Sequence, residues 1–266
     1  MNRLPSVTRT SWVWRRLSLG ALFTLGLIGS AFAIIPAYAC GPDSDCMLGQ
    51  RTYRIQMPET SGGKKPLGAI IFAHGYRGSA AGLMKNKGLS RTIADMGLVF
   101  VAPKSAGEDW DIPNAPNPGN NLDFAYFKRL KKELVQRHGV DGDRIMVSGF
   151  SAGGMMVWNL ACRLGDTFAA YAPIAGTFWA PVPEACPAMP VPLIHIHGTS
   201  DKIVPLKGRP IGSTRQGDVR KSARSPLFGL CAPGRRECYH RLRPRRNPRY
   251  RLTSMHRAPL LPPPFS

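Results

Sequence analysis

Acidic residues are scarce in this sequence, which has 16 Asp and Glu against 36 Lys and Arg in 266 residues. The shortage leaves a net charge of +20, a value that by itself is typical of nucleic-acid-binding proteins. The excess is uneven: residues 1–39 carry +4, residues 40–220 carry +6 and residues 221–266 carry +10. Because the central part is only mildly basic, we expect no specific nucleic-acid partner.

Long apolar runs are absent after residue 39, so we expect no membrane partner for the rest of the chain. In residues 1–39, four Arg precede an apolar stretch, and Ala37-Tyr38-Ala39 has the small residues that a signal peptidase reads. This pattern predicts an export signal cleaved before Cys40, and an extracellular or periplasmic protein. An uncleaved anchor, a lipidated Cys40 and either the Sec or the twin-arginine route are alternatives that the pattern leaves open.

The six cysteines include no Cys-x-x-Cys pair, and the histidines do not group around them. We therefore expect no metal site and no other cofactor. Export to an oxidising compartment would let cysteines pair. Cys40 and Cys46 are close enough to close a small loop, and Cys162 and Cys186 flank a segment that a disulfide would pin to a helix.

Strand and helix signals alternate along the middle of the chain. Short apolar runs typical of buried parallel strands occur at 68–73 and 98–102, and residues 122–138 have apolar positions at helical spacing with a basic face that we expect to be solvated. This alternation predicts an α/β fold with a mainly parallel central sheet. The other expected elements are strands at 51–57, 144–148, 171–175 and 191–196 and a helix at 153–162.

A Gly-x-Ser-x-Gly pattern surrounds Ser151. The pattern is weak alone, but here it follows an apolar strand and precedes a helix, which is the arrangement of a nucleophile elbow. The glycines permit a strained turn and close approach of the helix to the strand. We therefore expect the Ser151 hydroxyl to be a nucleophile, held at the carboxyl edge of the sheet. A Gly-rich turn with an uninvolved serine is the alternative.

The pair His74-Gly75 directly follows the strand expected at 68–73, where such enzymes place the loop that supplies an oxyanion-hole amide. We expect the backbone N–H groups of Tyr76 and Ala152 to bind the oxyanion. His74 precedes Ser151, whereas the chain order of this architecture is nucleophile, acid, histidine. We therefore expect a structural role for His74.

Asp201 comes just beyond the strand expected at 191–196 and is our candidate for the acid that orients a catalytic imidazole. A turn or helix-capping aspartate is the alternative. His195 and His197 alternate on that strand and precede the acid, so we expect them to be structural or to line the site.

These motifs together resemble one family, the exported esterases that include poly(3-hydroxybutyrate) depolymerases and feruloyl esterases. The resemblance covers about residues 40–221, and its elbow and His-Gly-Thr-x-Asp motifs are distinctive in combination. The residues that carry it are Cys46-x-x-Gly49-x-Arg51-x-Tyr53, His74-Gly75, Gly142-Asp143-Arg144-Ile145, Gly149-Phe-Ser151-Ala-Gly-Gly-Met-Met156 and His197-Gly-Thr-x-Asp201-x-x-Val-Pro205.

The resemblance implies an α/β-hydrolase fold and a serine esterase that acts on polyhydroxyalkanoate-like or hydroxycinnamoyl esters. It also implies Ser151 as nucleophile and Asp201 as triad acid. We expect Trp110, and Trp179 after the strand at 171–175, to form an aromatic wall for the acyl group, although core packing is an equal alternative for Trp179.

The C-terminal part departs from that family, whose catalytic histidine lies near the C-terminus after one more core strand. Here residues 222–266 form an Arg- and Pro-rich tail that we expect to be disordered and to replace the final strand and histidine loop, since Pro removes donors and like charges repel. His240 and His256 follow Asp201 but are poor candidates for the base. We interpret the abrupt change near Lys221 as a reading-frame change.

Two functions of different class are open at this point. The chain is either an exported serine esterase, or a catalytically silent esterase-like scaffold whose basic tail binds anionic surfaces. The sequence leaves the particular ester and the oligomeric state undetermined.

Overall fold

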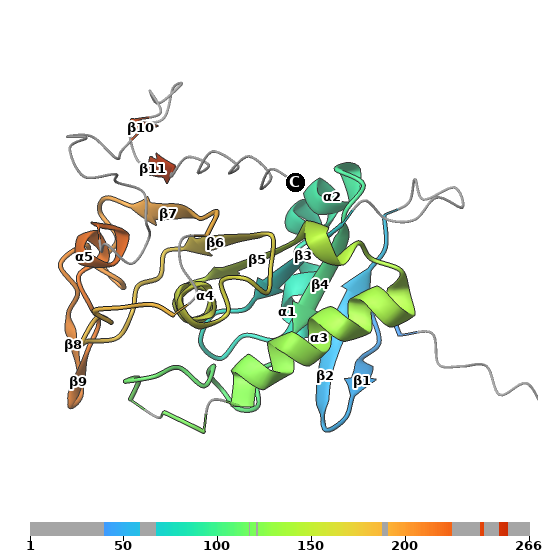
Figure 1. Cartoon of the computed structure of the whole chain (residues 1–266), viewed down its shortest axis with the longest axis horizontal. Coiled ribbons are helices and arrows are strands. Elements are labelled where there is room, and N and C mark those ends of the chain that lie inside the picture. The colour runs from blue at the N-terminus through green and yellow to red at the C-terminus, as the bar shows by residue number, and fades with distance from the viewer. Residues whose placement is uncertain are drawn as a thin grey trace, which may run out of the picture. The chain divides into compact units, whose positions relative to one another are not determined.

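The computed structural model describes residues 40–58, 68–116, 118–120, 122–187, 191–224, 240–241 and 250–254. The fold is organised around a sheet with helices on both of its faces (Figure 1). The predicted export signal, His256 and most of the predicted tail lie outside these residues. Among the helices within the described ranges, none has the length and apolar character needed to cross a membrane.

The central sheet runs in the order β1-β2-β4-β3-β5-β6-β7-β11-β10. Its five middle strands pair in parallel and the outer ones are antiparallel, so the predicted α/β fold with a mainly parallel sheet is confirmed. Parallel strands end at the same edge, and this places the segments after β3, β5 and β7 together. The strands are β1 Cys46–Leu48, β2 Arg51–Gln56, β3 Ala69–Ala73, β4 Val99–Pro103, β5 Ile145–Phe150, β6 Ala170–Ile174, β7 Ile194–Gly198, β10 His240–Arg241 and β11 Tyr250–Ser254.

Alternate residues of the sheet supply two separate cores. In β3, Ile71 packs in the larger cluster with the helices α3 and α4, whereas Ile70 and Phe72 pack in the smaller cluster with α1 and α2. This alternation follows from the two-residue repeat of a strand. The helices are α1 Ala80–Lys85, α2 Lys87–Asp95, α3 Leu122–His138, α4 Ala152–Arg163 and α5 Val219–Arg224, and a short hairpin joins β8 Pro210–Ile211 to β9 Thr214–Arg215.

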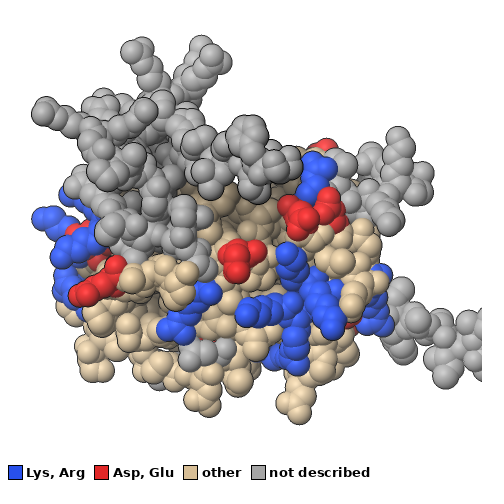
Figure 2. All heavy atoms as spheres, in the orientation of Figure 1, with Lys and Arg blue, Asp and Glu red and all other residues tan. Residues whose placement is uncertain are grey.

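Helix α3 has the bounds that its apolar spacing predicts. Leu130 and Leu134 are fully buried, while Lys128, Arg129 and Lys132 are exposed on the opposite side. Figure 2 shows Lys and Arg side chains gathered over this helix. The basic cluster is therefore the outer face of an amphipathic helix, as expected.

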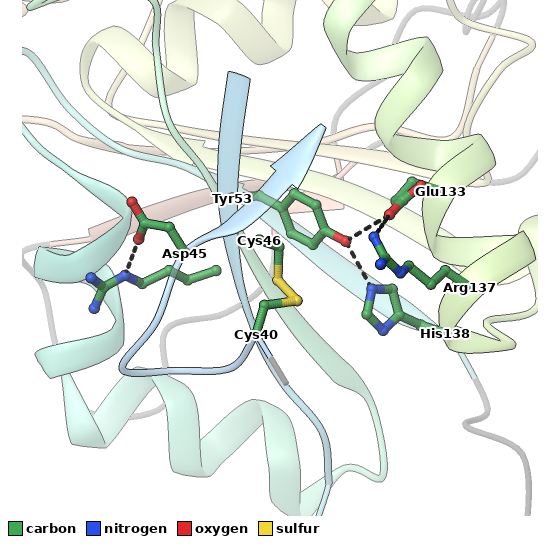
Figure 3. Close-up of a disulfide and its surroundings, with 8 residues drawn as sticks. Cys40, Asp45, Cys46, Tyr53, Glu133, Arg137 and His138 are labelled. Carbon is green, nitrogen blue, oxygen red and sulfur yellow. Dashed lines mark hydrogen bonds and ion pairs between the residues drawn. A yellow bond between two sulfur atoms is a disulfide. The ribbon is translucent and has the colours of Figure 1, made fainter. Parts of the chain in front are cut away.

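Both predicted disulfides are present, Cys40–Cys46 and Cys162–Cys186. The first closes the loop before β1 (Figure 3). Close to it, the Tyr53 hydroxyl lies 2.8 Å from Nε2 of His138, which joins β2 to the end of α3. Burial lowers the pKa of His138, which favours the neutral ring.

Strand β7 begins later than predicted, at Ile194 rather than Val191. Before it, Leu193 makes only an isolated parallel bridge to Tyr171. The reason is Pro192, which has no N–H to donate to a ladder.

The expectation that residues 222–266 form no strand is wrong for two short segments. β11 pairs antiparallel with β7, and β10 pairs antiparallel with β11. Residues 250–254 contain neither Pro nor Gly, and β7 offers them an edge of unpaired backbone groups. The open edge of the sheet, rather than apolar sequence, accounts for this strand.

Candidate active site

The elbow, residues 149–153, carries Ser151 between β5 and α4 in the predicted strand, turn and helix arrangement. Ser151 has φ 57° and ψ −118°, a strained conformation for a residue with a side chain. Its amide donates to the carbonyl of Ile174 at 2.9 Å, which fixes the turn against β6. The Ser151 hydroxyl does not cap the helix that it begins, and so is not used to hold the turn.

Two glycines allow α4 to approach the sheet closely at this point. A Cβ added at Gly153 would lie 2.1 Å from the carbonyl oxygen of Ala73, and one at Gly154 would lie 2.5 Å from that of Ile174. Both contacts are with backbone atoms, which cannot move aside as a side chain can. The motif's glycines are therefore steric requirements of the elbow.

Residues 74–78, which are predicted to supply an oxyanion-binding amide and are called the oxyanion loop below, lie beside the elbow. A Cβ at Gly75 would lie 3.7 Å from the Cβ of Ser151. The loop is held from outside, because the Arg77 amide donates to the Glu108 carbonyl at 2.8 Å and the Arg77 guanidinium pairs with the Glu108 carboxylate at 3.1 Å. This pair lowers the pKa of Glu108. Sequence reasoning missed Glu108, since nothing in its local pattern marks it.

The two amides predicted to bind an oxyanion come from these neighbouring segments. Within the described residues, the Tyr76 amide donates to no backbone carbonyl. Ala152 is the first residue of α4, so its amide has no partner inside the helix. The positive end of the helix dipole adds to the attraction for a negative oxygen there.

His74 supports the oxyanion loop. Its Nδ1 lies 2.8 Å from the Gly75 carbonyl, and its Nε2 accepts from the Ser105 amide at 3.2 Å, so Nδ1 carries the proton. Burial lowers the pKa of His74, which favours the neutral ring. Both ring nitrogens are used in this way, which agrees with the expected structural role.

Asp201 lies in the turn after β7 and uses its two carboxylate oxygens differently. Oδ1 accepts from the amides of Ile203 and Val204 at 2.8 and 2.9 Å, which is the turn-forming arrangement given above as an alternative. Oδ2 lies 3.7 Å from Nε2 of His197, beyond hydrogen-bond distance. The turn role therefore leaves one oxygen of Asp201 for another partner.

His195 and His197 are buried and hydrogen-bonded to each other. The Nε2–H of His197 donates to the Val204 carbonyl at 2.7 Å, so its Nδ1 accepts from Nε2 of His195 at 3.2 Å. Burial lowers the pKa of His195 to about 3. Both ring nitrogens of His197 are engaged, and neither imidazole is arranged to take a proton from Ser151.

A cavity of about 330 Å³ lies at the carboxyl ends of β5, β6 and β7. We call it the strand-end cavity. Asp201 lines it. Ser151 is a backbone neighbour of two lining residues, because it follows Phe150 and its amide donates to the carbonyl of Ile174. The lining residues are Phe150, Ile174, Ala175, Ile196, His197, Gly198, Ser200 and Asp201.

The register of the outer strands separates His240 from this cavity. His240 pairs with Ser254, and Ser254 pairs with Ile194 at the start of β7, whereas the cavity adjoins Gly198 at the end of β7. Four residues along a strand correspond to about 13 Å. The backbone of His240 therefore lies at the opposite edge of the sheet from Ser151.

The two tryptophans expected to contact an acyl group are both buried. Trp110 is 1% exposed, and its indole N–H donates to the His74 carbonyl at 2.7 Å, so it holds the first residue of the oxyanion loop. Trp179 is 6% exposed and borders a second cavity of about 750 Å³ beside α4. Trp110 lines another cavity, of about 430 Å³, together with Tyr76, so the two tryptophans border different cavities. Within the described ranges, no group of three His, Cys, Asp or Glu is arranged to hold a metal ion.

The sheet order and the elbow define the class of protein, an α/β-hydrolase. A family model described as phospholipase/carboxylesterase matches residues 123–213, a stretch that contains Ser151 and Asp201. The chain is therefore similar to phospholipases and carboxylesterases over this stretch, in agreement with the resemblance that its motifs carry.

Similar proteins carry esterase names. The chain is 31% identical over 147 residues to the putative esterase NocK of Nocardia uniformis subsp. tsuyamanensis, over 54% of this chain and 42% of that protein. It is 24% identical over 243 residues to feruloyl esterase D of Neurospora crassa, and the match covers 82% of this chain and 79% of that protein. The solved structure of a thermostable esterase is 23% identical, with a TM-score of 0.49, and the match covers 67% of this chain and 48% of that one. The chain spans less than half the length of the first curated relatives it matches.

Proposed function

We propose that this chain is an exported serine esterase that works through an acyl-enzyme. The observation that carries the proposal is Ser151 at positive φ at the start of α4, beside the oxyanion loop. In the first step, Oγ bonds to the ester carbonyl carbon while its proton passes to a general base, and the C=O π bond opens to an oxyanion that the amides of Tyr76 and Ala152 hold. The alcohol then leaves with a proton, and water hydrolyses the acyl-serine to release the acid.

For the acyl group we propose a hydroxycinnamoyl or a polyhydroxyalkanoate-like ester. The names of relatives, which include feruloyl esterases C and D, support the first class. The two disulfides support export, because such bonds persist in oxidising compartments. Trp110 and Trp179 would act on the acyl group only if their surroundings open, since both side chains are buried.

A fluorophosphonate probe tests the proposal directly. We expect residues 40–266, purified with both disulfides, to be labelled and to hydrolyse p-nitrophenyl butyrate and methyl ferulate. Ser151→Ala is the matched control and should abolish both signals, while Ser148→Ala, a buried serine on the same strand, should be labelled normally. Labelling that persists in Ser151→Ala would refute the assignment of the nucleophile.

A second candidate is a silent scaffold that binds esters without turning them over. It is favoured by the hydrogen bonds that engage both nitrogens of His74 and His197, and by the register that places His240 at the opposite edge. Loss of a triad member lowers turnover by about 10⁴ to 10⁶-fold but leaves binding in place. A folded protein that binds methyl ferulate and shows no Ser151-dependent turnover under any condition would support this candidate.

A further inference from the structure

We propose that the cavity of about 750 Å³ beside α4 is a second binding site, and that it takes a neutral, hydroxyl-rich ligand, namely a sugar of two or three rings. We call it the α4 cavity. The inference does not rest on the proposed esterase function, because none of the residues that line this cavity belongs to the elbow or to the oxyanion loop.

The first observation is the position of the α4 cavity. Asn159 and Arg163 line it from α4, eight and twelve residues after Ser151. At a rise of about 1.5 Å per residue, they lie about 12 and 18 Å from Ser151 along the helix. The α4 cavity also shares no lining residue with the strand-end cavity. A ligand bound here is therefore held away from the nucleophile.

The second observation is the nature of the walls. Phe178, Trp179 and four prolines give the α4 cavity flat apolar surface. The disulfide Cys162–Cys186 joins one wall, residues 181–187, to α4. Small-molecule sites are largely preformed cavities of about 300 to 1,000 Å³ with mainly apolar and aromatic walls. The α4 cavity has this size and this kind of wall.

The third observation is that polar atoms of two buried lining residues have no partner. Asn159 is 4% exposed, and its Nδ2 donates to the Met155 carbonyl at 2.9 Å, which leaves Oδ1 as an acceptor that no described residue uses. Nε1 of Trp179 is buried and donates to no atom of the described part of the chain. The same holds for the acceptor Oε1 of Gln216, which forms an isolated antiparallel bridge with Trp179. Hydroxyl groups suit this set of atoms, because each of them both donates and accepts.

The fourth observation is the balance of charge. Arg163 and Glu184 line the α4 cavity, so it carries one cation and one anion. The Arg163 guanidinium lies over the Phe124 ring, 5.0 Å from its centroid, and Glu184 is exposed. A carboxylate ligand would meet Glu184 and an ammonium would meet Arg163, so neither sign of charge is favoured. A sugar meets no such repulsion, since its hydroxyls accept from a guanidinium and donate to a carboxylate.

Isothermal titration calorimetry of the purified protein tests the inference, with xylotriose, cellotriose and maltotriose as probes. We expect at least one of them to bind with a Kd of about 1 mM or tighter. Ala185→Trp puts a large side chain at an exposed lining position and should weaken this binding at least tenfold. Ala125→Trp, at an exposed alanine of α3 that does not line the cavity, is the matched control and should bind as the wild-type protein does. Ser151→Ala should also leave the binding unchanged.

Asn159→Leu supplies a second arm. It replaces the acceptor by an apolar side chain of similar size and should weaken the binding about fivefold, the effect of one hydrogen bond between neutral groups. Urea unfolding verifies that the variant is folded, and Ala185→Trp decides alone if it is not. No binding of any of the three sugars, or binding that a folded variant of the cavity leaves unchanged, would overturn the inference. Binding that Ser151→Ala abolishes would place the sugar at the nucleophile and overturn it as well.

Discussion

Around Ser151 the backbone is held by close steric contact, whereas around Asp201 it is held by hydrogen bonds. Gly153 and Gly154 let α4 touch the carbonyls of β3 and β6, and any Cβ there would collide. Asp201, which lines the strand-end cavity, accepts hydrogen bonds from two amides of its own turn. The elbow around Ser151 therefore tolerates no added carbon at Gly153 or Gly154, whereas the turn at Asp201 depends on an oxygen acceptor that another side chain can supply.

The largest effect should come from Gly153→Ala. Its Cβ would lie 2.1 Å from the Ala73 carbonyl oxygen, a contact with backbone that only a displacement of α4 relieves. We expect a loss of about 3 kcal/mol or more in the free energy of unfolding, together with loss of Ser151 labelling. Urea unfolding measures the first and a fluorophosphonate the second. Gly107→Ala is the control, because nothing lies within 4 Å of its Cβ, and it should change the free energy by less than about 0.5 kcal/mol.

The next effect is a loss of stability at low pH that we assign to His195, a buried residue of β7. The pKa of His195 is lowered from 6.5 to about 3, so below pH 6.5 the unfolded chain binds a proton that the folded chain does not. Stability should therefore fall as the pH drops from about 6.5 toward 3, by about 1.4 kcal/mol per pH unit from this group. Urea unfolding at pH 7, 6, 5 and 4 measures the slope. His195→Gln should reduce this slope by the amount that corresponds to one proton. Equal slopes in the wild-type protein and the variant would contradict the assignment of the effect to His195.

A smaller effect should separate the two roles of Asp201. Asp201→Ala removes the acceptor of both turn amides and should cost about 1 to 2 kcal/mol in the free energy of unfolding. Asp201→Asn keeps that acceptor and should cost less than about 0.5 kcal/mol. Thermal and urea unfolding of the two variants side by side make the comparison. Equal losses of stability would show that the charge, rather than the oxygen, holds the turn.

The smallest effect should be a gain in stability from Ser151→Gly. A residue with a side chain at φ 57° is strained, and glycine adopts this region readily. We expect the free energy of unfolding of Ser151→Gly to be about 1 kcal/mol larger than that of Ser151→Ala. The fluorophosphonate should label neither variant. If Ser151→Ala is as stable as Ser151→Gly, the elbow stores no strain of this kind.

Much of this architecture could be predicted from local sequence. The bounds of α3 follow from apolar positions at helical spacing, and β3 and β4 follow from short apolar runs. Both disulfide pairs were also predicted, since each joins cysteines near in the chain. These features depend on residues within one element or on near neighbours.

The other features depend on contacts between segments that are far apart in the sequence. β11 could not be predicted, because its position depends on the open edge of β7 more than on its own side chains. Glu108 was missed for the same reason, since its role appears only when the loop after β4 lies against residues 74–78.

The sequence by itself determined the α/β order, the glycines of the elbow and the positions of Ser151 and Asp201, because these depend on local periodicity and on backbone angles that few residues adopt. Only the tertiary structure decided which groups share the strand-end cavity. It also decided that His74, His195 and His197 have their hydrogen bonds elsewhere and that His240 lies at the far edge of the sheet. Distances between side chains from different strands depend on pairing and register, and these are properties of the whole sheet.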